Sequence, residues 1–144
     1  GILGMCGLGG LSYTFLARRL VPSLGERGLA AVGGLIVGVA FVLVAVGPSW
    51  AWALPATFLA GLGFYGIHNT LQTNATQMAP AARGTSVTLF ACSLFLGQSI
   101  GVTAGAALLD GAGAFYLFAC AAAGMPTIGA WFSRGLRRRQ AIVT

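Results

Sequence analysis

The side chains best suited to chemistry lie in one segment, residues 61–78. At about 100° per residue, a helix over this segment places His68, Gln72, Asn69 and Thr73 on one polar arc, with the Tyr65 ring beside His68. Amides and imidazoles without partners are costly in hydrocarbon. The pattern therefore predicts that the arc faces other helices or a water-filled cavity.

Two interpretations of this arc stay open at the level of sequence. His68, Asn69 and Gln72 either hydrogen-bond neighbouring helices or line a cavity. Asn74 and Gln77 lie nearer Pro80, where headgroup-level polarity needs no cavity. His68 could also carry a proton, because small changes of environment move an imidazole across neutral pH.

No catalytic set accompanies the arc. Asp110 and His68 are expected at opposite boundaries of the membrane, too far apart for Ser/His/Asp chemistry. Cys6, Cys92 and Cys120 lie singly in apolar runs, without metal-ligand spacing. The sequence predicts no enzymatic activity, no metal and no cofactor.

The composition indicates what kind of element must position these residues. Of 144 residues, 57% are hydrophobic and 7% are charged, and mean hydropathy is +0.87. A soluble domain carries about 25% charged residues. Because a helix needs roughly 20 apolar residues to cross a bilayer, we predict one all-α integral membrane domain over residues 1–144. Its five transmembrane helices are expected at about residues 2–20, 29–47, 51–78, 85–109 and 114–133.

The arginines predict how this domain is oriented. They follow the first, third and fifth apolar runs, which alternation places on one side, and the positive-inside rule makes that side cytoplasmic. We expect a multi-pass protein of the plasma (inner) membrane with a cytoplasmic C-terminus, and no nucleic-acid binding despite a net charge of +6. Arg134, Arg137, Arg138 and Arg139 follow the last run, and the predicted cytoplasmic loop charges are Arg18, Arg19, Glu26, Arg27 and Arg83.

Glycine is abundant, with 23 residues. Small residues allow membrane helices to approach closely. Gly97, Gly101 and Gly105 recur every four residues and predict a packing or gating face on the fourth run. Gly33 and Gly34 in the second run are interpreted as static packing.

Three segments together resemble the C-terminal half of a major facilitator superfamily transporter. Residues 71–86, LQTNATQMAPAARGTS, resemble the join between helices ten and eleven. Residues 20–28, LVPSLGERG, resemble the loop between helices eight and nine, although Glu26 stands where a basic residue is usual. Residues 108–113, LLDGAG, are similar to the external turn between helices eleven and twelve.

The resemblance implies helices eight to twelve of a partial six-helix C-terminal bundle. Because the first run is short and the chain begins without Met, we expect a fragment that lacks the start of helix eight. The implied function is secondary active transport of a small solute, efflux- or antiport-like, by alternating access. The implied partners are the lipid bilayer, the missing N-terminal half, the solute and, as a candidate coupling ion, protons. The expected pathway residues are Tyr65, His68, Asn69, Gln72 and Thr73. The alternative is a non-transporting polytopic scaffold or subunit.

Overall fold

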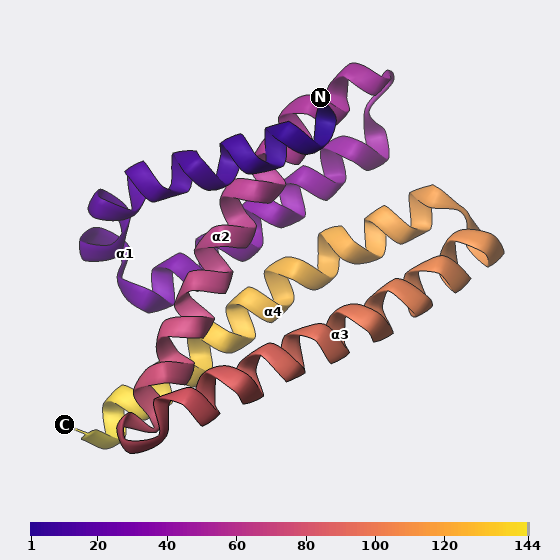
Figure 1. The fold of residues 1–144 in the computed structure, drawn as a ribbon. Helices are drawn as coiled ribbons and strands as arrows, with labels where there is room; N and C mark the ends of the chain where they lie inside the picture. Colours follow the sequence, from indigo (N-terminus) through magenta and orange to yellow (C-terminus); the bar gives the residue numbers. More distant parts are fainter. Residues whose placement is uncertain (144) are drawn as a thin grey trace.

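The chain folds into long helices (Figure 1). The computed structural model describes the backbone of residues 1–143 and the side chains of residues 1–135. Four helices in this part are each long and apolar enough to cross a membrane, which confirms the all-α prediction. They are α1 (Ile2–Val46), α2 (Ala53–Met78), α3 (Arg83–Ala112) and α4 (Ala114–Val143), with short 3-10 turns η1 (Trp50–Trp52) and η2 (Pro80–Ala82).

Helix α1 bends back on itself at Gly25. This residue alone within α1 has a non-helical backbone, with φ 63° and ψ 176°. Such a positive φ suits glycine, which has no Cβ to clash. Figure 1 shows the first limb (residues 2–24) running away from the N-terminus and the second limb (residues 26–46) returning beside it. The sequence predicted two separate spans here, and the structure has two helical limbs that are joined at Gly25 without an intervening loop.

The other connections are equally short. Helix α2 ends at Met78, as predicted, and η2 leads from Pro80 directly into α3. The backbone N–H of Gly113 (φ 92°) donates to the Leu109 carbonyl, which closes the C-terminus of α3. Helix α4 begins at Ala114, as predicted, and continues to Val143, ten residues past the predicted end at 133.

Glycines bring both limbs of α1 into backbone contact with α2. A Cβ on Gly61 would clash with the Cys6 carbonyl of the first limb. In the second limb, a Cβ on Gly33 would lie 2.9 Å from the Gly63 carbonyl oxygen, and one on Gly63 would lie 2.7 Å from that of Gly33. These contacts leave no room for a side chain. They agree with static packing as the role of Gly33.

The second limb of α1 also packs closely on α4. A Cβ on Gly34 would lie 2.8 Å from the Met125 carbonyl oxygen, and one on Gly129 would lie 2.7 Å from that of Ala30. Toward the other end of the same interface, the rings of Phe41 and Phe118 stack with centroids 6.2 Å apart. The second limb is therefore the central helix, with α2 on one side and α4 on another.

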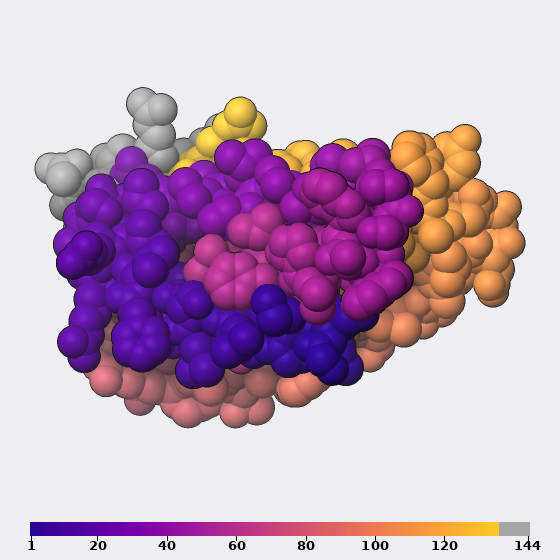
Figure 2. Space-filling view, turned by 90° about the horizontal axis from the view of Figure 1, so that it is seen from above, coloured from indigo at the N-terminus to yellow at the C-terminus, as the bar shows by residue number. Residues whose placement is uncertain are grey.

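Helix α3 is the least enclosed element. None of its residues is buried against the described part of the chain. No described atom lies within 4 Å of a Cβ placed on Gly97 or Gly101, and Gly105 meets only the Leu117 side chain, at 3.5 Å. In Figure 2 the orange end of the α3–α4 hairpin extends beyond the atoms of α1 and α2. The predicted packing or gating role of this glycine face thus stays a prediction.

The helix ends that carry arginine lie at one end of the bundle. The bend of α1, the α2–α3 connection and the C-terminus are at the left of Figure 1, and the opposite connections are at the right. Arg18 and Arg19 lie in helical turns of the first limb rather than in a loop, and Arg83 is the first residue of α3. The side chains of Arg137, Arg138 and Arg139 lie outside the described residues.

Candidate functional site

Helix α2 has two polar sides with different surroundings. One side, with Gly63, Gly66 and Thr70, is buried against α1, and Thr70 is only 4% exposed. The other side carries Asn69 and Thr73, which are both exposed. The structure therefore divides the polar arc that the sequence predicted as one surface.

The buried polar side is linked to the bend of α1 by hydrogen bonds. The Thr70 hydroxyl donates to the Gly66 carbonyl at 2.9 Å. The Asn74 amide nitrogen donates to the Thr70 carbonyl at 2.9 Å and to Glu26 Oε2 at 3.0 Å. Glu26 follows Gly25, so its carboxylate also lies at the positive N-terminal end of the second limb. The Glu26–Asn74 bond fastens the bend to the inner end of α2.

The sequence prediction did not bring the two partners of this bond together. Glu26 was expected among the loop charges, but it lies in the second limb and is half-buried, as is Arg27. For Asn74 the headgroup level was one open interpretation; in the structure Asn74 is half-buried and its amide donates to Glu26. The signal for this bond in the sequence was Glu26, a single carboxylate among arginines, together with the amide-rich end of α2. Spacing along the chain could not reveal a contact across 48 residues.

His68 lies between two aromatic rings. The Phe64 ring, one turn earlier on α2, stacks nearly parallel to the imidazole, with centroids 5.5 Å apart and an interplanar angle of 19°. The Phe90 ring of α3 lies at 5.5 Å and 51°. His68 Nδ1 is buried and has no hydrogen-bond partner among the described residues. Nε2 is not fully buried, so it is the ring atom that a further partner could reach.

Phe90 was missed by the sequence analysis. On a helical wheel it lies about 20° from Gly97, on the same face of α3 as the glycine repeat. Because Gly97 and Gly101 on that face contact no other helix in the described part of the chain, the position gave no signal of a contact with α2.

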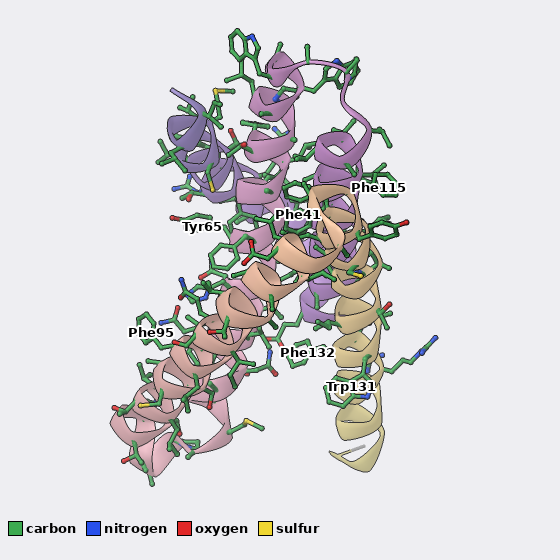
Figure 3. The ribbon with its side chains drawn as sticks, turned by 90° about the vertical axis from the view of Figure 1, so that its right-hand side faces the viewer. Phe41, Tyr65, Phe95, Phe115, Trp131 and Phe132 are labelled. Carbon is green, nitrogen blue, oxygen red and sulfur yellow. The ribbon has the colours of Figure 1, made fainter. Side chains whose placement is uncertain are left out.

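The remaining predicted pathway residues lie within two turns of His68 along α2. Tyr65 is 43% exposed, and its ring lies over Gly10 of the first limb. Gln72 is half-buried one turn beyond His68. Figure 3 shows Tyr65 and Phe95 on one side of the bundle, with Phe115 and Trp131 along α4 on the other. Of the predicted pathway residues, Tyr65, Asn69 and Thr73 are thus exposed and His68 and Gln72 are half-buried, and their role in a pathway stays a prediction.

The chemistry of this surface is hydrogen bonding and ring contact. It offers an imidazole, amides and a phenol, each able to donate and accept. No group of His, Cys, Asp or Glu in the described part of the chain could hold a metal ion. Nothing on the surface supplies a nucleophile with an adjacent base.

Comparison with protein-family models, with curated proteins and with solved structures gives no match to this chain. The resemblance to the major facilitator superfamily therefore stays a prediction that rests on the three sequence segments.

Proposed function

We propose that this chain is part of a secondary active transporter that moves a small solute by alternating access. The observation that carries the proposal is that Tyr65, Asn69 and Thr73 of α2 are exposed, whereas Gly66 and Thr70 of the same helix are buried. Hydrocarbon does not satisfy such groups. In a bilayer they need water or a second bundle of helices, and a transport pathway supplies both.

The proposal includes five membrane crossings. The limbs of α1 contain about 20 residues each, and at 1.5 Å per residue each limb is about 30 Å long, which matches the hydrocarbon core. With α2, α3 and α4 they form the C-terminal half of a major facilitator superfamily fold. The end that carries the arginines lies on the cytoplasmic side of the plasma (inner) membrane, as the positive-inside rule expects.

The packing suggests how such a half could move. Helices α1, α2 and α4 touch through backbone atoms, so they act as one stiff unit. Helix α3 contacts this unit where Phe90 meets His68 of α2 and where Gly105 lies near Leu117 of α4. Its Gly97 and Gly101 are left uncovered by the described part of the chain. Smooth glycine faces suit helices that slide or rock on a partner. We assign this face to contact with the other half of the transporter.

A non-transporting scaffold is the second candidate. It is favoured by the Glu26–Asn74 bond and by the burial of Thr70, because both use polar groups of α2 for internal packing. Under this alternative the exposed groups of α2 bind a neighbouring helix and stay dry.

Water access separates the two functions. In the protein that carries this chain, Cys6, Cys92 and Cys120 are first replaced by serine. Asn69→Cys is then treated with a membrane-impermeant thiol reagent from the cytoplasmic side, with Thr70→Cys as the buried control. We expect labelling at position 69, slowed by the transported solute, and none at 70. An inert cysteine at 69 in the folded protein would exclude the transport pathway and leave the scaffold.

A further inference from the structure

The surroundings of His68 restrict the chemistry of any solute that this part of α2 can bind. Resting on the proposed function, we propose that His68, Asn69 and Gln72, with the rings of Phe64 and Phe90, bind an uncharged, ring-shaped solute rich in hydrogen-bonding groups. Three observations support this assignment: the ring contacts, the orientation of the imidazole and the absence of charge on these helix segments.

The ring contacts make an apolar wall beside the polar groups. Phe64 and Phe90 each lie 5.5 Å from the imidazole, and Phe64 remains 49% exposed. Tyr65 meets Phe64 edge-on at 5.9 Å and is also partly open. Flat solutes with C–H or aromatic faces stack on such rings, which adds about 0.5–1.5 kcal/mol per aromatic pair beyond area burial.

The imidazole is held so that one atom can meet a solute. Nδ1 is buried without a partner in the described part of the chain, so in our proposal Nε2 is the atom that meets the solute. Gln72 lies one turn along α2 on the same face as His68, and Asn69 lies about 100° further around the helix. These groups both donate and accept hydrogen bonds, as hydroxyl or amide groups on a ring require.

Charge is absent where the solute would lie. Residues 50–78 and 84–109 contain no Asp, Glu, Lys or Arg. The carboxylate of Glu26 receives the Asn74 amide, and Asn74 lies about 120° from His68 around α2. A charged solute would therefore leave water without a counterion on this surface, which is costly. An uncharged solute avoids that cost.

Chemical modification of the imidazole tests this assignment. His68 is the only histidine in the chain, so diethylpyrocarbonate modification can be followed by mass spectrometry of its peptide in the intact protein, in nanodiscs. The probes are glucose and nicotinamide as uncharged rings, and tetraphenylphosphonium and benzoate as charged ones. A probe at twice its dissociation constant slows modification about threefold by occupancy.

We expect His68 to react, and at least one uncharged probe to slow the reaction while neither charged probe does. Phe90→Ala should abolish the protection, whereas Phe95→Ala, on the same helix but 64% exposed, should preserve it. Gln72→Ala, a change away from the rings, should weaken the protection if the amide binds the probe, and full protection in this variant would remove Gln72 from the site.

Several results would overturn the inference: an unreactive His68, protection by charged probes, or protection by none of the four. The Asn69→Cys labelling decides the proposed function separately. Labelling that the transported solute slows, together with protection of His68 by a charged probe, would keep the transporter and reject the uncharged solute.

Discussion

The interface between α1 and α2 and the exposed face of α3 are both rich in glycine, yet these glycines differ in their contacts. At Gly61 and Gly63 a single added carbon would meet backbone atoms of α1. At Gly97 and Gly101 it would meet no atom of the described chain. The comparison shows that a glycine repeat marks a potential for close approach, and that only a partner turns this potential into packing.

The same contrast occurs between the two polar sides of α2. Asn74 donates to a carboxylate of α1, while Asn69, five residues earlier, is exposed. One asparagine therefore stabilises the bundle and the other is available to a ligand or a second bundle. Each contrast can be tested by a pair of matched substitutions, one at the packed position and one at the exposed position.

The largest effect is expected from alanine at the α1–α2 interface. Gly61→Ala places a Cβ against the Cys6 carbonyl, and overpacking of this kind costs about 1–3 kcal/mol. Gly101→Ala should instead stabilise the helix by up to about 1 kcal/mol, because alanine is the better helix former. Unfolding by SDS titration in mixed micelles measures both. Equal effects of the two substitutions would remove the distinction between these glycines.

The next effect, of similar size, is expected for the hydrogen bond at the bend. Asn74→Leu leaves the half-buried Glu26 carboxylate without its amide donor, which costs about 1–3 kcal/mol in unfolding free energy. The exposed counterpart, Asn69→Leu, should change it by less than about 0.5 kcal/mol. The same SDS titration compares the two. A stable Asn74→Leu protein would mean that the bend is held by glycine packing alone.

The smallest effect is expected where aromatic rings meet α4. Phe118→Leu keeps most of the apolar volume but loses the stack on Phe41, at a cost of about 0.5–1.5 kcal/mol. Phe95→Leu, on the exposed side of α3, is the matched control and should be within about 0.5 kcal/mol of the parent. Thermal unfolding in detergent, followed by near-ultraviolet circular dichroism, detects the difference. A larger loss at Phe95 would indicate that α3 has a partner in solution.

Much of the helical arrangement could be predicted from residue order. The length of each apolar run and the helix-ending residues Gly47, Pro80 and Gly113 locate the connections between helices. Hydrocarbon thickness sets how long each apolar run must be. The break in α1 was harder, because Pro22 and Ser23 remain helical and only Gly25 leaves the helical region. The contact of His68 with Phe90 could not be predicted, because contacts between helices depend on their crossing geometry.

By itself, the sequence determines that this protein is helical and suited to a membrane, and that one helix carries its single histidine and both of its asparagines. Composition, length and residue order suffice for that. The tertiary structure alone decided which side of α2 is buried, that Asn74 meets Glu26, and which glycines touch backbone. Helical periodicity assigns each side chain an angle around its own axis, but not the neighbour toward which that angle points.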